Sequence, residues 1–164
     1  MIRATTLEDI STVQQIARIS WNDTYRDIIP EETQELFLQK AYSTMMLAKR
    51  MEKTIFLIAE YNNQAIGFAN FTTVDEDGDA ELTAIYVLPE FQKLGYGKKL
   101  LQAGLDKMHS GRQLFVYVES KNEKARIFYE NVGFKCLEEF DEFFEGQPLS
   151  TAKYVHLLKT PTFE

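Results

Sequence analysis

The chain has 164 residues, which is enough to fold as one domain around a core of its own. Hydrophobic residues make up 45% of the sequence and charged residues 26%, a composition that argues against intrinsic disorder. The formal net charge of -7 disfavours nucleic acid as a partner, because such binding needs a basic surface. A single cysteine, Cys136, excludes an internal disulfide. With only two histidines beside it, a structural zinc site has too few ligands, so we expect no metal.

The sequence contains no apolar run near the length of about 18 residues that a membrane span needs. The first residues, MIRATTLEDI, lack the apolar core of a signal peptide. We therefore expect a cytoplasmic protein with no membrane partner. Thiols stay reduced in that compartment, and we interpret Cys136 as a small buried residue.

The first half of the chain predicts helices and then a meander of strands. A short strand at residues 1–5 precedes apolar residues at helical spacing. Aromatic and β-branched residues follow, divided by the turn signals Asn62-Asn63 and Asp77-Gly78 and stopped by Pro89. The predicted elements are a helix at about 7–21, a short helical turn after Pro30, a helix capped by Ser43 that runs to about Lys53, and strands at 54–60, 65–74 and 79–88.

The second half alternates helices with strands. Leucines at helical spacing follow the loop after Pro89, and Gly111 and Gly133 mark the ends of two helices. The predicted elements are a helix at about 95–109, a strand at 113–118, a helix that ends at Gly133, a short strand at 134–137, a loop or turn at 138–145 and a final strand at 151–158. This order predicts a single mixed α/β domain at residues 1–160 with a tail at 161–164.

The loop at residues 92–97, QKLGYG, joins a strand to a helix. Its two glycines allow positive dihedral angles and a close approach of the backbone to a ligand. Unpaired N–H groups and the helix dipole favour an anion such as phosphate, and Lys98 and Lys99 add positive charge. The loop is not a P-loop, and it lacks the third glycine of the dinucleotide fingerprint. By itself the pattern fits either a phosphate site or tight packing.

A second motif lies at residues 122–134, NEKARIFYENVGF. Together the two motifs resemble the GNAT superfamily of acetyl-CoA-dependent N-acyltransferases. That family pairs Q/R-x-x-G-x-G/A after the fourth strand with N-x-x-A-x-x-F/L-Y-x-x-x-G-F on the last helix. The resemblance covers nearly the whole chain, and its specific part is about 81–134. It implies a single-domain α/β fold whose mixed, largely antiparallel sheet is flanked by helices and splayed between the fourth and fifth strands.

The resemblance also implies acetyl-CoA as co-substrate and a groove that holds it. The pantetheine arm lies against the strand that ends at Val87, and the pyrophosphate sits on backbone N–H groups of the loop. Gln92 orients the loop or the phosphates. Asn122 hydrogen-bonds the pantetheine arm, with a simple helix cap as the alternative. The implied cofactor-binding residues are Ile85, Tyr86, Val87, Gln92, Lys93, Leu94, Gly95, Tyr96, Gly97, Lys98, Asn122 and Tyr129.

Two residues are candidates for catalysis. An amine that attacks a thioester expels a thiolate, and a thiol of pKa about 8.5 leaves more easily when a tyrosine of pKa about 10 donates a proton. The resemblance assigns this acid to Tyr129, and a core tyrosine with a paired hydroxyl is the alternative. Glu81, at the start of its strand, is the candidate base, and Glu119 is the second choice. A solvated acid at a hairpin end is the alternative for Glu81.

The acceptor site is expected on the N-terminal helices. Trp21 and Tyr25 are four residues apart and share a helix face if the helix continues that far. The segment from Trp21 to Pro30 resembles the W-x-x-x-Y…P pattern of bacterial polyamine and related small-amine acetyltransferases. An aromatic wall with nearby acids suits a cationic amine, although both rings could simply pack the helix pair.

The hypotheses about function differ in which amine accepts the acetyl group and in whether the protein catalyses a reaction at all. The leading hypothesis is acetyl transfer to a small-molecule amine such as a polyamine. The alternatives are a protein N-terminal or lysine amine, an amino acid or an aminoglycoside, and a non-catalytic acyl-CoA-binding module. The final strand either pairs across a homodimer or completes the sheet.

Overall fold

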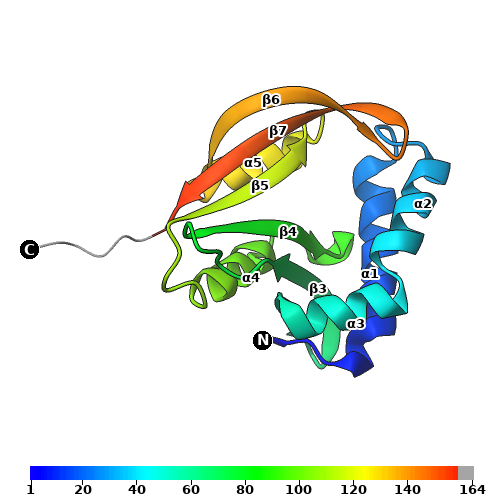
Figure 1. The fold of residues 1–164 in the computed structure, drawn as a ribbon. Helices are drawn as coiled ribbons and strands as arrows, with labels where there is room; N and C mark the ends of the chain where they lie inside the picture. The colour runs from blue at the N-terminus through cyan, green and yellow to red at the C-terminus, as the bar shows by residue number, and fades with distance from the viewer. Residues whose placement is uncertain (159–164) are drawn as a thin grey trace, which may run out of the picture.

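The chain folds into one seven-stranded sheet with helices on both faces (Figure 1). A computed structural model describes residues 1–158. The predicted domain end at 160 and the predicted tail at 161–164 lie outside the described residues. The strands are β1 (Ile2–Ala4), β2 (Ile55–Tyr61), β3 (Gln64–Phe71), β4 (Asp79–Val87), β5 (Gln113–Glu119), β6 (Lys135–Phe144) and β7 (Gln147–Leu157).

The sheet runs in the order β1-β2-β3-β4-β5-β7-β6. Each pair of neighbours is antiparallel except β4 and β5, which are parallel. A parallel pair needs a crossover, and the helix between β4 and β5 supplies it. The predicted mixed, largely antiparallel sheet is therefore confirmed. The final strand, β7, lies between β5 and β6 and completes the sheet of its own chain, while a homodimer stays a prediction.

The helices divide between the two faces of the sheet. One core packs the first three helices against residues such as Phe68 and Ala84. The other core packs α4 and α5 against residues such as Phe71 and Leu82. The helices are α1 (Ile10–Tyr25), α2 (Glu31–Ala41), α3 (Thr44–Lys53), α4 (Tyr96–Leu105) and α5 (Glu123–Asn131), with short 3-10 helices η1 (Leu7–Asp9) and η2 (Pro89–Phe91).

The helix boundaries differ in places from those predicted. Helix α1 continues beyond residue 21 to Tyr25, which puts both candidate acceptor residues on one helix. The predicted turn after Pro30 is the full helix α2, and α4 stops at Leu105 rather than at 109. Ser43 caps α3 as predicted, because the Met46 N–H group donates to its Oγ atom at 3.2 Å.

The predicted loop at 138–145 was wrong, because β6 runs without a break to Phe144. Strand β7 also begins earlier than predicted and pairs with β6 along its length. The turn between them falls at Glu145 and Gly146, which both have positive φ angles, of 48° and 80°. Acidic residues have low strand propensity, but pairing with a neighbouring strand overrides that preference. Charges on an edge strand also protect it from further pairing.

Cys136 is exposed, so its prediction as a small buried residue was wrong. It lies on β6, which is the edge of the sheet and has a neighbour on one side only. A register shift follows between Cys136 and Glu138, and the thiol donates weakly to the Glu138 carbonyl at 3.7 Å. The irregular edge therefore leaves this side chain in solvent.

Strands β4 and β5 splay apart, as the family resemblance implies. They pair only at three positions, the last being Glu81 with Phe115. Beyond that pair β4 continues to Val87 and β5 to Glu119 without a shared ladder. Figure 1 shows the two strands diverging toward the loop that precedes α4. The β5-facing backbone groups of residues 82–87 are thus left without a strand partner.

A bulge in β4 changes which face its side chains occupy. Phe71 pairs with Leu82 and Asn70 pairs with Ala84, so Thr83 is an extra residue. Leu82 consequently packs in the core under α4, whereas Ala84 packs in the core under α1. The bulge therefore presents Tyr86 to the α1 side while Val87 packs on the α4 side.

Candidate active site

The loop after β4 presents a row of free backbone donors. Within residues 1–158 the N–H groups of residues 93–98 have no hydrogen-bond acceptor, and the Lys99 N–H group bonds Gly95 O at 3.0 Å. Lys93 and Gly95 have positive φ angles, of 65° and 91°. When positive and negative φ angles alternate along a loop, successive N–H groups turn toward one side and form a concave anion site. At a helix N-terminus this arrangement suits the oxygens of a phosphate.

Side chains around this loop keep it open and in place. A Cβ atom added to Gly95 would meet nothing within 4 Å, so this glycine serves the backbone conformation and leaves space above it. Gln92 Nε2 donates to the Val87 carbonyl at 3.1 Å, which ties the loop to the end of β4. Lys93 and Lys98 are exposed and add positive charge beside the free N–H groups.

Tyr129 lies in the core beneath the splay. Its ring is 6% exposed and contacts Phe128 and Phe134, with ring centroids 5.3 Å away in each case. The Tyr129 hydroxyl forms no hydrogen bond within residues 1–158. Its oxygen atom is not completely buried. Burial raises the pKa of Tyr129 well above its usual value, and the nearby Tyr25 adds to the rise. The hydroxyl therefore keeps its proton at neutral pH.

Asn122 has two separate contacts. The Ala125 N–H group donates to Asn122 Oδ1 at 3.2 Å, so the residue caps α5. Burial raises the pKa of Tyr25, and the nearby polar side chains of Tyr86 and Asn122 oppose that rise. The structure brings Tyr25, Tyr86 and Asn122 together from α1, β4 and α5.

The two candidate bases occupy different places along the splay. Glu81 is half-buried at the last paired position of β4, and burial raises its pKa while the positive charge of Lys153 opposes the rise. Glu119 is 9% exposed at the end of β5, where the Lys121 N–H group donates to its Oε2 atom at 2.5 Å. The charge of Glu119 raises the pKa of Tyr25, so this carboxylate lies near the tyrosines.

An aromatic wall lines the α1 side of β4. The Trp21 ring lies 4.5 Å from Tyr25, stacks on Phe37 at 4.5 Å and on Phe144 at 5.9 Å, measured between centroids. Trp21 is only 6% exposed, and its Nε1 atom is buried without a partner among the described residues. This placement agrees with the alternative in which Trp21 packs the helices rather than contacting an acceptor. Tyr25 is half-buried and remains the more accessible of the two rings.

The tip of the β6–β7 hairpin completes this wall. Phe144 packs on Phe37 of α2 with centroids 5.0 Å apart, and Lys40 Nζ lies 2.8 Å from Glu145 Oε2. Figure 1 shows the hairpin arching across to α2. Sequence reasoning missed Phe37 and Phe144, because their only signal was aromatic character in segments predicted as a turn and a loop.

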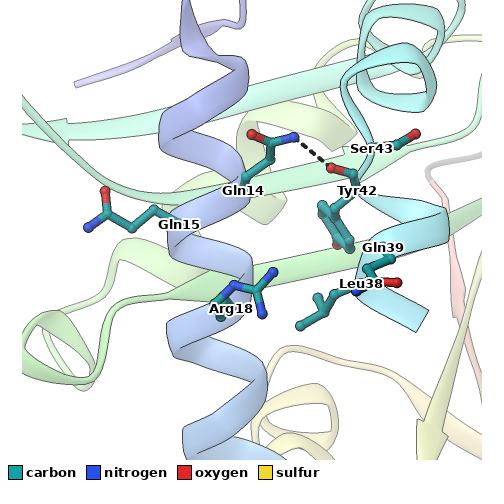
Figure 2. Close-up of a pocket in the computed structure, with 7 residues that line it drawn as sticks. All are labelled: Gln14, Gln15, Arg18, Leu38, Gln39, Tyr42 and Ser43. Carbon is teal, nitrogen blue, oxygen red and sulfur yellow. Dashed lines mark hydrogen bonds between the residues drawn. The ribbon is translucent and has the colours of Figure 1, made fainter. Parts of the chain in front are cut away.

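A separate depression of about 480 Å³ lies between α1 and the end of α2 (Figure 2). Gln14 Nε2 donates to the Tyr42 carbonyl across it at 2.9 Å. None of the predicted cofactor or acceptor residues lines this depression, so it is distinct from the groove at the splay. The lining residues are Gln14, Gln15, Arg18, Leu38, Gln39, Tyr42 and Ser43.

The fold and the groove where β4 and β5 splay apart define the class of this protein, which is an acetyl-CoA-dependent N-acetyltransferase. A model of the Acetyltransferase (GNAT) family matches residues 13–134, and the chain belongs to that family. The spermidine N(1)-acetyltransferase of Thermoplasma acidophilum is 30% identical over 142 residues, which cover 82% of this chain and 87% of that protein. The uncharacterized N-acetyltransferase YuaI of Bacillus subtilis is 31% identical over 134 residues, which cover 79% and 76%.

A solved structure agrees with this family. The PaiA N-acetyltransferase of Thermoplasma acidophilum in complex with coenzyme A has a TM-score of 0.82 and 27% identity, over 96% of this chain and 98% of that chain. Acetyl-CoA is the co-substrate of this chain as well. Its residues fit that molecule, because the free N–H groups at 93–98 and the open space at Gly95 suit a pyrophosphate.

Two further features concern metals and membranes. In the part of the chain that the structure describes, no three His, Cys, Asp or Glu side chains gather where they would hold a metal ion. No helix within residues 1–158 is both long and apolar enough to cross a membrane.

Proposed function

We propose that this N-acetyltransferase acts on a primary amine of a small cationic molecule, with polyamines as the leading class. The observation that carries the proposal is the α1 side of β4, where the aromatic wall of Tyr25 and Phe144 lies on the same side of the sheet as Glu81. Aromatic faces and carboxylates both stabilise an ammonium group. The similarity to a spermidine acetyltransferase supports the same class of acceptor.

The free backbone groups of the chain hold the cofactor in this proposal. The N–H groups of residues 93–98 bind the pyrophosphate, with Gln92 holding the loop against β4. The unpaired edge of β4 at residues 85–87 binds the amides of the pantetheine arm as an added strand would. Asn122 donates its amide N–H to the same arm while its oxygen caps α5.

Tyr129 acts as the general acid in this proposal. Direct attack of the amine on the thioester carbon forms the new C–N bond and breaks the C–S bond, and the sulfur leaves as a thiolate. The hydroxyl of Tyr129 is protonated at neutral pH, and it hydrogen-bonds the departing sulfur and passes its proton to it. Burial raises the pKa of Tyr129 and so makes it a weaker acid than a free tyrosine, which means that the proton moves only once the sulfur carries the negative charge of a thiolate. Free N–H groups on the splayed edge of β4 stabilise the oxyanion that forms during attack.

Glu81 acts as the general base, directly or through a water molecule. An ammonium group must lose a proton before it can attack, and a carboxylate whose pKa is raised by burial accepts that proton more readily than an ordinary one. Tyr25 contacts the acceptor, and Trp21 supports it from behind through ring packing. Glu119 is the second candidate for the base.

An acetyl-CoA-dependent screen of amines tests this proposal. The panel contains spermidine, spermine, 1,3-diaminopropane, a peptide with free N-terminal and lysine amines, free amino acids and an aminoglycoside. We expect the polyamines to have the highest kcat/KM, measured as thiol release and as acetylated product by mass spectrometry. Preferred acetylation of the peptide, amino acids or aminoglycoside would contradict the acceptor class.

Binding without turnover is a separate outcome of that screen. Acetyl-CoA at 100 times its Kd should stabilise the folded chain by about 2.7 kcal/mol, which raises the Tm. A rise in Tm with no acetylated product from any amine would support a non-catalytic acyl-CoA-binding module and contradict the proposed reaction.

A further inference from the structure

Helix α5 carries Tyr129 but has few buried side chains to hold it in place. It lies against β5 and β7 (Figure 1). Of residues 123–131, all of which the structure describes, only Tyr129 is buried. Ala125 and Phe128 are partly buried at the margin of the same core. Because a helix is held on a sheet mainly by its buried apolar face, the position of α5 must depend on other contacts as well.

Tyr154 of β7 provides such a contact. Its side chain is fully buried in the core under α5, on a strand with neighbours on both sides. Its hydroxyl accepts a hydrogen bond from Arg126 Nε at 2.9 Å and donates one to Glu130 Oε2 at 2.9 Å. Arg126 and Glu130 are four residues apart, so they are neighbours on one face of α5. Hydrogen bonds to charged groups are about twice as strong as neutral ones, so a rigid point of the sheet holds one turn of the helix.

Arg126 extends this link to two more parts of the sheet. Its Nη1 atom donates to the Ser120 carbonyl at 3.1 Å, and its Nη2 atom donates to Glu139 Oε1 at 2.5 Å. Ser120 directly follows β5, and Glu139 lies on β6. The guanidinium therefore ties α5 to β6, to β7 and to the end of β5 at the splay.

Tyr154 also contacts the proposed general acid, since its ring centroid is 6.3 Å from that of Tyr129. Resting on the proposed function, we propose that Tyr154 is a positioning residue, whose hydroxyl fixes α5 on the sheet and whose ring supports the ring of Tyr129. The acid must come within about 2.6–3.2 Å of the sulfur. A misplacement of about 1 Å lowers the rate of such a step by as much as about 100-fold. Tyr154 acts through Tyr129 and exchanges no proton with the substrates.

A double-mutant cycle with Tyr129 tests this inference. The measured quantity is the rate of acetyl transfer in a single turnover, with the amine of the panel that the wild type acetylates fastest. Tyr154→Phe keeps the ring and loses both hydrogen bonds, so we expect the rate to fall about tenfold. The Kd of CoA should change less than about threefold. Adding Tyr154→Phe to Tyr129→Phe should lower the rate no further, because the acid that Tyr154 positions is already absent.

Two further variants separate positioning from stability. Glu130→Ala removes the acceptor of the Tyr154 hydroxyl from the exposed side of α5, so it spares the core and should slow transfer about threefold in the same non-additive way. Glu139→Ala removes the exposed ion pair of Arg126 and leaves both bonds of Tyr154 in place. This control should transfer at the rate of the wild type.

Each outcome decides between the inference and the proposed function. A wild-type rate in Tyr154→Phe, or in Glu130→Ala where Tyr154→Phe does not fold, would overturn the inference while the role of Tyr129 stands. An equal loss with and without Tyr129→Phe would also overturn it, because a merely structural effect multiplies. A loss in Glu139→Ala as large as in Tyr154→Phe would do the same. A wild-type rate in Tyr129→Phe would refute the general acid and this inference with it.

Discussion

In the proposed function, the two sides of β4 recognise their ligands by different means. On the α4 side, the proposed cofactor surface consists mainly of the free backbone N–H groups at 93–98, with Lys93 and Lys98 exposed beside them. On the α1 side, rings from α1, α2 and the β6–β7 hairpin form the surface, with Trp21, Phe37 and Phe144 in mutual contact. A site made of backbone groups needs only a short run of residues that allow the required backbone conformation, so it can be recognised as a motif in the sequence. A side-chain site assembled from distant segments leaves none.

Tyr129, which lies at the meeting of the two sides, is expected to give the largest effect. Tyr129→Phe removes the proton donor but keeps the ring, so kcat should fall by about 100-fold or more. The Kd of CoA should change little, because the backbone donors remain. Stopped-flow thiol release and calorimetric binding measure the two quantities. A wild-type rate in Tyr129→Phe would refute the role of general acid.

Glu81 tests the acceptor side of β4. We expect Glu81→Gln to lower kcat/KM about tenfold near neutral pH. Burial raises the pKa of Glu81 above 4.5, and the base works only when it is ionised. The activity of the wild type should therefore decline on acidification at a pH above the ordinary carboxyl range. This acidic limb should be absent in Glu81→Gln.

Lys153 and Glu119 provide the matched controls for that pH profile. Lys153 opposes the rise in the pKa of Glu81, so Lys153→Met should move the acidic limb to higher pH. If the acidic limb of the pH profile persists in Glu81→Gln but is lost in Glu119→Gln, then Glu119 rather than Glu81 is the base.

Gly95 tests the cofactor side, and Gly146 is its control. Both have positive φ angles, and a Cβ atom at either would meet nothing within 4 Å. Alanine at either position should cost about 1 kcal/mol and lower the Tm by about 2–4 °C. Only Gly95→Ala should raise the KM for acetyl-CoA, by about fivefold, because it distorts the row of free N–H groups. Equal KM values in the two variants would argue against a pyrophosphate at this loop.

Asn122 should give the smallest effect, and two substitutions separate its contacts. Asn122→Ala loses the cap of α5 and should destabilise the fold by about 1 kcal/mol, whereas Asn122→Asp keeps a capping oxygen and the stability. Both lose the amide donor, so both should raise the KM for acetyl-CoA about threefold, as expected for one hydrogen bond. A normal KM in Asn122→Asp would leave Asn122 as a cap alone.

The motifs of the proposed cofactor side can be found in the sequence for a physical reason. The loop at 92–97 and the helix with Asn122 and Tyr129 are each continuous segments, so their spacing is fixed by local geometry. The splay follows from the family resemblance to these motifs, and the pairing that ends at Glu81 confirms it.

The acceptor side is harder to predict from sequence. The stretch 138–145 has low strand propensity, and only its pairing with β7 makes it a strand. Phe144 and Glu145 then reach α2 across more than a hundred residues of sequence, which no local pattern encodes. The placement of Lys153 over Phe115 likewise depends on the order of strands in the sheet.

Intact-protein mass spectrometry tests direct transfer at the splay most plainly. The protein is mixed with acetyl-CoA alone, and spermidine is then added. We predict an unmodified protein mass in both steps, including at the exposed Cys136, and acetylated spermidine only after the second step. An acetylated protein that forms before spermidine is added and loses its acetyl group afterwards would contradict direct attack.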